Sequence, residues 1–246
     1  MSIDFQAAHR QHSSATHSFD NNLLSPDDAS SASPANNGDN TLIGGTGNDQ
    51  LFGGNGDDTL QGAAGNDLLS GGNGDDTLIG GSGVDVMLGG RGNDVLVWNP
   101  GDGSDRLDGG SGFDTMLFNG RAGTETFNFS AKAGGGALFT RDIGNITMDL
   151  TSVEKVTLNA LGGADNIHIN DPSGSGVTEF DINLGLNGVG DGASDTIFLN
   201  DDDHVQVVDN GHGDITILGL SGATVHITGF EAANDHLVIN GDPFQF

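Results

Sequence analysis

A nine-residue unit repeats without a gap from residue 44 to residue 97, and this repeat constrains the fold more than any other feature of the sequence. The six copies read GGTGNDQLF, GGNGDDTLQ, GAAGNDLLS, GGNGDDTLI, GGSGVDVML and GGRGNDVLV. Every copy has an aspartate at its sixth position and an apolar residue at its eighth, and degenerate copies flank the run at 35–43 and 109–117. A unit this short cannot bury its own apolar residue, so the copies must stack into a solenoid.

The glycines and the apolar residue predict the local structure of each copy. Glycines at the first, second and fourth positions favour a tight turn, because they allow backbone angles that other residues avoid. The last three residues are expected to form a short strand that points one apolar side chain inward. Two copies with turns on opposite sides would then close one coil.

This geometry places the aspartates in columns. Parallel strands stack about 4.8 Å apart, so aspartates of every second copy repeat at roughly that spacing. Two unit charges at that distance repel by about 3–4 kcal/mol at an effective dielectric constant of about 20. Between residues 39 and 114 the sequence has thirteen Asp, no Glu, and only Arg91 and Arg106 as cations. The positively charged side chains of the repeat are therefore too few to neutralise the aspartate columns.

Calcium fits such columns, because its oxygen ligands lie at about 2.3–2.6 Å and two carboxylates about 4.8 Å apart can flank it. We expect several calcium ions, and magnesium suits the shared cage less well because it sheds water reluctantly. The predicted carboxylate ligands are Asp49, Asp58, Asp67, Asp76, Asp85 and Asp94, with Asp105 and Asp114 as further candidates. The predicted pairs are Asp49 with Asp67, Asp58 with Asp76, Asp67 with Asp85, and Asp76 with Asp94. Backbone carbonyls of the loop glycines would complete the shell: Gly44, Gly47, Gly53, Gly56, Gly62, Gly65, Gly71, Gly74, Gly80, Gly83, Gly89 and Gly92.

The pattern GGxGxDx(apolar)x resembles the RTX, or haemolysin-type, calcium-binding repeat of proteins exported by Gram-negative bacteria. The resemblance covers about a third of the chain and implies a parallel β-roll with calcium between its turns. The sequence departs from the pattern at Ala63 and Ala64 and at Asn40, which stands at a carboxylate position. An insertion in 98–108 separates Asp94 from Asp105 by eleven residues instead of nine, which leaves the pairing of Asp85 with Asp105 open.

Two alternatives explain the repeat less well. A disordered acidic linker needs no apolar residue in strict register with aspartate, and a metal-free solenoid leaves the charge repulsion unrelieved. The formal net charge of the chain is −28, which disfavours nucleic acid and anionic membrane as partners and attracts divalent cations. The chain has no cysteine, so metal ions rather than disulfides are the expected stabiliser.

The sequence predicts an all-β protein in three parts: a disordered N-terminal arm at 1–34, the β-roll at 35–118, and a second β-rich domain at 119–246. The last part would be a parallel β-helix or a β-sandwich continuing the roll. Its alternating segments predict strands at 126–129, 146–150, 153–158, 166–169, 196–199, 215–218, 224–227 and 236–239. Asp165, Asp195, Asp203 and Asp235 each stand two residues before an apolar residue, as in the repeat.

Motifs of catalysis are absent from the sequence. It contains no HExxH, no GxSxG, no cysteine and no tyrosine. Acid–base pairs could be assembled from Asp201, Asp202, Asp203 and His204, or from His212 and Asp214, but polar turns are the expected reading of both. We therefore predict no enzyme activity.

The predicted function is calcium binding that folds an exported extracellular or cell-surface protein. The alternatives are a roll attached to a polysaccharide-acting β-helix enzyme, and a toxin or adhesin component. No apolar segment suits a secretory signal or membrane insertion. The resemblance implies export through a type I machinery, which uses a C-terminal signal. The ending 242–246, an acidic residue followed by apolar ones, weakly resembles such a signal. It could equally be a truncation or a last strand. A glycan or other cell-surface partner stays open.

Overall fold

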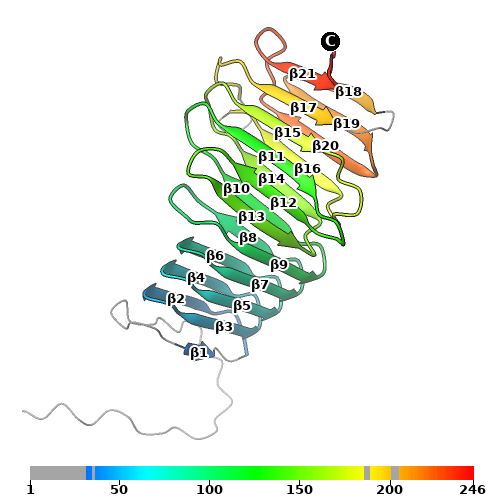
Figure 1. Cartoon of the computed structure of the whole chain (residues 1–246). Coiled ribbons are helices and arrows are strands. Elements are labelled where there is room, and N and C mark those ends of the chain that lie inside the picture. Colours follow the sequence, from blue (N-terminus) through cyan, green and yellow to red (C-terminus); the bar gives the residue numbers. More distant parts are fainter. Residues whose placement is uncertain (1–31, 35–36, 186–188, 201–204) are drawn as a thin grey trace, which may run out of the picture.

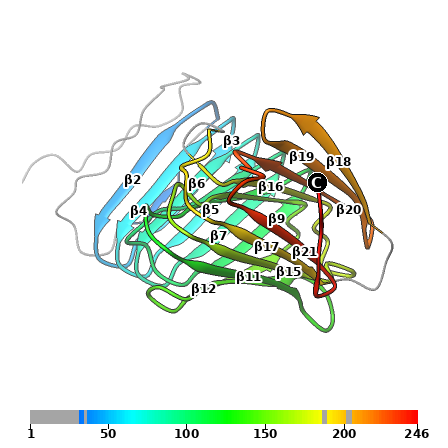
Figure 2. The same ribbon diagram turned by 90° about the horizontal axis from the view of Figure 1, so that it is seen from above.

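A computed structural model shows a solenoid of two facing β-sheets. It describes residues 32–34, 37–185, 189–200 and 205–246. The strands stack along one axis from the blue end to the red end of Figure 1, and the view in Figure 2 shows the two sheets facing each other. No described helix has the length and apolar character that crossing a membrane requires. The all-β class and the parallel roll predicted from the repeat are confirmed.

The strands alternate between the two sheets in the repeat region. The twelve-stranded sheet has the order β1-β3-β5-β7-β9-β13-β12-β11-β15-β17-β21-β22, and the ten-stranded sheet has the order β18-β19-β20-β16-β14-β10-β8-β6-β4-β2. Their bounds are β1 Ala32–Pro34, β2 Thr41–Thr46, β3 Gln50–Asn55, β4 Thr59–Ala64, β5 Leu68–Asn73, β6 Thr77–Ser82, β7 Val86–Arg91, β8 Val95–Trp98, β9 Arg106–Ser111, β10 Thr115–Asn119, β11 Thr126–Ala131, β12 Ala137–Arg141, β13 Ile146–Thr151, β14 Lys155–Asn159, β15 Asn166–Asn170, β16 Glu179–Asn183, β17 Thr196–Asn200, β18 Gln206–Gly211, β19 Asp214–Leu220, β20 Ala223–Thr228, β21 His236–Ile239 and β22 Asp242–Pro243.

Two copies of the repeat close one coil, as predicted. Residues eighteen apart are paired in parallel, as with Leu51 and Leu69 or Leu60 and Leu78. The apolar position of every copy is fully buried between the sheets. The prediction of a three-residue strand was wrong, because β2–β7 have six residues each and run through the first three positions of the next copy. Hydrogen bonding between coils includes these glycines in the sheet despite their low strand propensity.

The insertion after Trp98 is absorbed in one loop. The Asn99 amide donates to Asp102 Oδ2 at 2.6 Å, and the Trp98 indole donates to the Gly103 carbonyl at 2.8 Å. Strand β9 then resumes the register, since Met87 pairs with Leu107. The two extra residues therefore leave the stacking unchanged.

Both sheets continue past residue 118, where we predicted a boundary between two domains. Strand β10 pairs in parallel with β14, and β13 pairs in parallel with β9. All eight strands predicted in this half are present, while β12, β16 and β18 were not predicted. Antiparallel hairpins insert β12 beside β11 and β13, and β19 beside β18 and β20. The division at 118 stays a prediction.

The predicted N-terminal arm falls almost wholly outside the described residues. Its last three residues, Ala32–Pro34, form β1 and pair in parallel with β3. The open edge of the sheet at β3 offers these three residues backbone hydrogen bonds, and the disordered arm at 1–34 stays a prediction.

Candidate metal centre

The aspartates of the repeat stand immediately before their strands and form two rows, one along each sheet. The first ladder precedes β3, β5, β7 and β9 and consists of Asp49, Asp67, Asp85 and Asp105. The second ladder precedes β2, β4, β6, β8, β10 and β14 and consists of Asn40, Asp58, Asp76, Asp94, Asp114 and Glu154. All the aspartates of both ladders are at least nine-tenths buried.

One carboxylate oxygen of each aspartate has a structural partner. In the first ladder the Asp67 amide donates to Asp85 Oδ1 at 2.7 Å, and the Asp85 amide donates to Asp105 Oδ1 at 2.9 Å. The second ladder repeats this bond, from the Asn40 amide to Asp58 Oδ1 at 2.7 Å through to the Asp114 amide and Glu154 Oε2 at 2.8 Å. The four predicted pairs are therefore neighbours in a ladder, and so are Asp85 and Asp105.

The other oxygen of these carboxylates lacks a partner within the described chain. Oδ2 is buried without a hydrogen bond in seven of the repeat aspartates: Asp58, Asp67, Asp76, Asp85, Asp94, Asp105 and Asp114. A buried carboxylate oxygen without a partner costs free energy unless a proton or a cation satisfies it. The structure thus repeats one unsatisfied ligand in seven turns of the roll.

Backbone oxygens converge on the same interior space. A Cβ built on Gly44 would lie 2.6 Å from Asp49 Oδ2 and 2.8 Å from the Gly62 carbonyl oxygen. The same pairing recurs at Gly53 with Asp58 and the Gly71 carbonyl. Any side chain at the first position of a copy would fill the space in which these oxygens meet. Carboxylate and carbonyl oxygens are the ligands that calcium prefers, so the donor set fits that ion.

The glycines at the fourth position have a different surrounding. They have positive φ, for example +115° at Gly56 and +129° at Gly74. The Gly56 carbonyl oxygen lies so close to Gly74 that a Cβ on Gly74 would overlap it. These glycines let successive turns touch, and their predicted role as ligands stays a prediction.

The pKa values of several ladder aspartates are raised, which fits a site for cations. Burial raises the pKa of Asp76 and Asp105 to about 7 and that of Asp85 and Asp114 to about 6, against the amide hydrogen bond that lowers each. Neighbouring ladder carboxylates add to the rise, as Asp94 and Asp58 do for Asp76. Mutual repulsion and desolvation both oppose ionisation here, and a bound divalent cation would relieve both.

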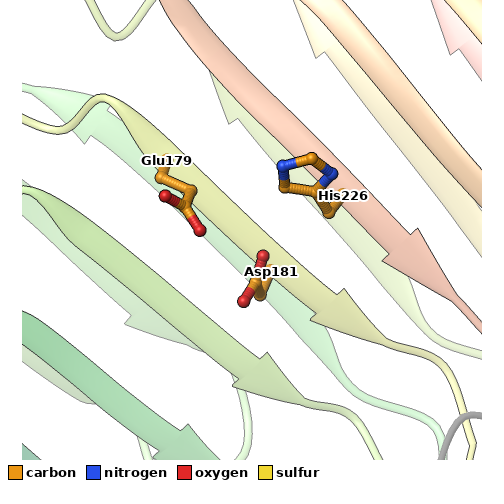
Figure 3. A group of neighbouring side chains, drawn as sticks. All are labelled: Glu179, Asp181 and His226. Carbon is orange, nitrogen blue, oxygen red and sulfur yellow. The ribbon is translucent and has the colours of Figure 1, made fainter.

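A second group of possible metal ligands lies on the outer face of the ten-stranded sheet. Glu179, Asp181 and His226 bring ligand atoms within 4.8 Å of one another (Figure 3). Lys155 Nζ already pairs with Glu179 Oε1 at 2.6 Å and with Asp181 Oδ2 at 2.5 Å. This group has its own cation, which the two ladders lack, so the ladders are the stronger candidate.

Sequence reasoning missed Glu154 as the last member of the second ladder. It stands two residues before the buried Val156, which is the spacing of the repeat with glutamate in place of aspartate. Of the proposed acid–base groups, Asp201–His204 lie outside the described residues. His212 lies exposed in the turn between β18 and β19, and Asp214 is the exposed first residue of β19.

Comparison with known families matches the same stretch. A family model described as the RTX calcium-binding nonapeptide repeat (4 copies) matches residues 34–69, 61–96 and 101–116. No curated protein matches the chain. All eight predicted aspartate ligands lie inside the matched stretches, which end before β11. Residues 34–116 therefore carry RTX repeats of the haemolysin type, a calcium-binding family.

Proposed function

We propose that the repeat aspartates bind calcium between successive coils and that this binding folds the roll. The observation that supports it is the row of buried Oδ2 atoms without partners in seven repeat aspartates, from Asp58 to Asp114. Each ion would be held by carboxylates of neighbouring ladder members and by carbonyls of first-position glycines such as Gly62 and Gly71. The role is binding and structural rather than catalytic.

Circular dichroism of the full chain tests the proposal. The protein is measured in excess chelator and then titrated with calcium to about 10 mM, with magnesium as the control ion. We expect a cooperative gain of β signal with calcium and a weak response to magnesium. A spectrum already complete in chelator and indifferent to calcium would contradict the proposal.

A pair of variants assigns the response to the ladder. Asp67→Asn keeps an oxygen that can accept the Asp49 amide bond of 2.8 Å but removes the charge that two neighbouring sites share. Asp57→Asn is the matched control, because Asp57 is exposed at the variable fifth position and also accepts one amide bond, 2.8 Å from Asp75. Asp67→Asn should shift the calcium midpoint upward by about tenfold or more, since affinity follows the charge of the ligands. Equal shifts in both variants would refute the register.

We further propose that the protein is exported before it folds. Calcium modules that act outside cells bind with a Kd of about 10⁻⁴–10⁻³ M, so such a roll would stay unfolded inside a cell and fold outside. The absence of cysteine supports stabilisation by metal in place of disulfides. The same titration decides this point, because a midpoint below about 10⁻⁶ M would let the roll fold before export.

A further inference from the structure

A third row of buried carboxylates lies beyond the matched repeats. The third ladder precedes β11, β15, β17 and β21 and consists of Glu125, Asp165, Asp195 and Asp235. Its members are linked as in the repeat: the Glu125 amide donates to Asp165 Oδ1 at 2.8 Å, the Asp165 amide to Asp195 Oδ1 at 2.8 Å, and the Asp195 amide to Asp235 Oδ1 at 2.9 Å. The hairpin of β12 and β13 separates it from the first ladder.

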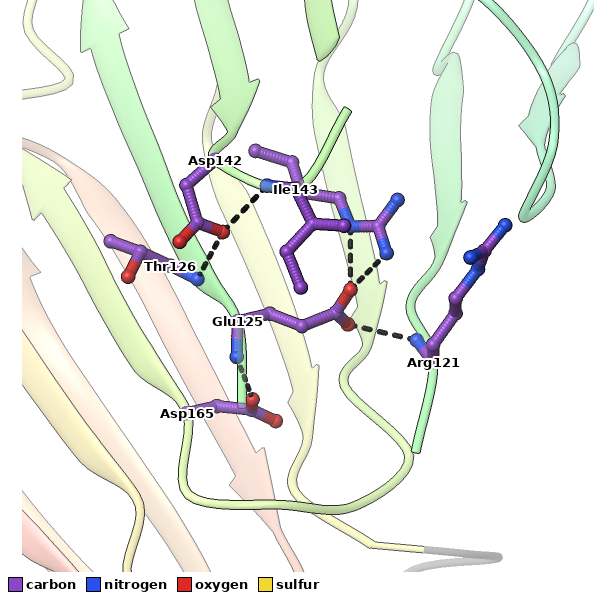
Figure 4. A network of polar contacts seen from close by, with 7 residues as sticks. Arg121, Glu125, Thr126, Asp142, Ile143 and Asp165 are labelled. Carbon is purple, nitrogen blue, oxygen red and sulfur yellow. Dashed lines mark hydrogen bonds and ion pairs between the residues drawn. The ribbon is translucent and has the colours of Figure 1, made fainter. Parts of the chain in front are cut away.

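The first member of the third ladder has a cation of its own. Arg141, on β12, is buried and donates through Nε to Glu125 Oε1 at 2.6 Å, while the Arg121 amide donates to Glu125 Oε2 at 2.8 Å (Figure 4). Both oxygens of Glu125 are thereby satisfied. No metal is needed at this end.

The other members lack any such cation. The sequence from residue 156 to residue 246 contains neither lysine nor arginine. Two further carboxylates add negative charge beside them. Asp191 Oδ2 accepts the Gly163 amide at 2.6 Å, and the Glu231 amide donates to Asp235 Oδ2 at 2.6 Å. The charges of Asp191 and Glu231, together with Asp235, raise the pKa of Asp195, although burial is the larger cause.

The carboxylate of Asp165 is buried and has one oxygen without a hydrogen-bond partner among the described residues. It is 1% exposed, and its Oδ2 has no hydrogen-bond partner in the described chain. In Figure 4 this oxygen points away from the Glu125 amide that the other oxygen accepts. Burial raises the pKa of Asp165 to about 8, and Asp195, Glu125 and Asp191 contribute. A carboxylate buried in this way needs a cation if it is ionised.

The loop that precedes β15 brings a glycine close to Asp191. A Cβ at Gly162 would lie 2.8 Å from Asp191 Oδ2, so only glycine keeps that approach open. Asp165 and Asp195 offer carboxylate oxygens, which favour a hard cation of calcium size over a transition metal. Because these ligands come from the half that the repeat family does not match, the site is independent of calcium binding by the first two ladders.

We propose that Asp165 and its ladder neighbour Asp195 bind calcium between the turns that precede β15 and β17, outside the nonapeptide repeats, with the charge of Asp191 beside them. It stabilises the half of the solenoid that has a hydrophobic interior of its own. Glu125 and Arg141 close the row on one side with an internal ion pair in place of a metal.

Hydrogen–deuterium exchange of the full chain, followed peptide by peptide as calcium is added, tests the site. In the unmodified protein calcium should slow exchange in 160–166 and 190–196, and magnesium should not. Asp165→Asn should raise the calcium concentration needed for this protection by at least about tenfold, because a ligand charge is lost. Peptides within 44–97 should keep their response. Asp171→Asn is the control, since Asp171 is exposed, lies outside the third ladder and accepts the local Ser173 amide at 2.9 Å.

The outcomes separate this site from the repeat sites. Unchanged exchange in 160–166 and 190–196 on addition of calcium would overturn the inference even if the repeats respond. A response there without one in 44–97 would overturn the proposed function and leave this site standing. If Asp165→Asn has lost its β signal in chelator, Asp195→Asn replaces it, and an unaltered midpoint in that variant also overturns the inference.

Discussion

Strands β2–β7 and β14–β17 follow the same coiled path but fill the interior differently. We call β2–β7 the thin strands and β14–β17 the wide strands, after the width of the apolar interior that they enclose. Each thin strand buries one apolar side chain and a glycine, as with Leu69 and Gly71 in β5. Each wide strand buries two apolar side chains, as with Phe180 and Ile182 in β16. A fully buried side chain of this kind contributes about 1.5–3 kcal/mol. The width of the apolar interior therefore sets how far a coil depends on bound cations.

Removal of calcium should produce the largest difference between the two regions, in the protection of their amides from exchange. In chelator we expect the amides of β3–β7 to exchange freely, while those of β14–β17 keep protection at least about a hundredfold greater. Hydrogen exchange in chelator measures both regions in one sample. Uniform exchange along the solenoid would show that the wide strands do not stay folded without the thin strands. It would contradict the idea that the two regions depend differently on calcium.

Substitution of a first-position glycine should have the next largest effect. In Gly62→Ala the new Cβ would lie 2.6 Å from the Gly80 carbonyl oxygen and 2.9 Å from Asp67 Cβ. The backbone of two coils must move apart, at a cost of about 3–5 kcal/mol in the free energy of unfolding of the calcium-bound roll. Thermal unfolding in calcium measures it.

Gly134→Ala is the control for that substitution. Its φ is +97° and no atom lies within 4 Å of the added Cβ, so only backbone strain of about 1–2 kcal/mol is expected. Equal losses in the two variants would mean that close packing between coils is not what the first position requires.

The pH dependence should differ in sign between the calcium-free and calcium-bound protein. Folding raises the pKa of Asp76 and Asp105 from 3.8 to about 7, so the calcium-free folded state binds more protons than the unfolded state. Its free energy of unfolding should therefore rise as the pH falls from about 8 toward 4, and gain nothing further below both pKa values. Calcium competes with those protons, so its apparent affinity should fall over the same range.

Circular dichroism in calcium-stripped buffers at pH 8, 6.5 and 5 checks the first trend, because the folded fraction of the roll should rise as the pH falls, and calcium titrations at the same pH values check the second. A calcium-free protein that loses stability as the pH falls would contradict the buried state of the ladders.

The smallest effect is expected at the one copy that departs from the glycine pattern. Ala63 has a φ of +81°, where the other copies have glycine, for example Gly54 at +107°. Ala63→Gly removes this strain and should raise the free energy of unfolding by about 0.5–1 kcal/mol after the entropy cost of glycine. Thermal unfolding in calcium measures it. A decrease in stability would indicate that the methyl group has a packing role.

The sequence predicted the coil, its two-copy closure and the aspartate rows because one strict period carries all three. It did not predict β12 or β18, since antiparallel hairpins inserted into a parallel sheet are set by tertiary pairing rather than by a period. Glu125 and Glu154 were missed although both stand two residues before a buried residue, because the repeat had been defined by aspartate. Burial of Oδ2 could be seen only once the coils were stacked.

The boundary between the thin and wide regions contains an optical reporter. Trp98 is the only tryptophan of the chain; it stacks on Phe118 with ring centroids 4.0 Å apart, and the Arg141 guanidinium lies 5.3 Å from its ring centre. Its indole also bonds to the inserted loop at Gly103. Fluorescence of the unmodified protein therefore reports on the coil where metal-dependent and core-dependent folding meet. Its time course after calcium is added would reveal which region forms first.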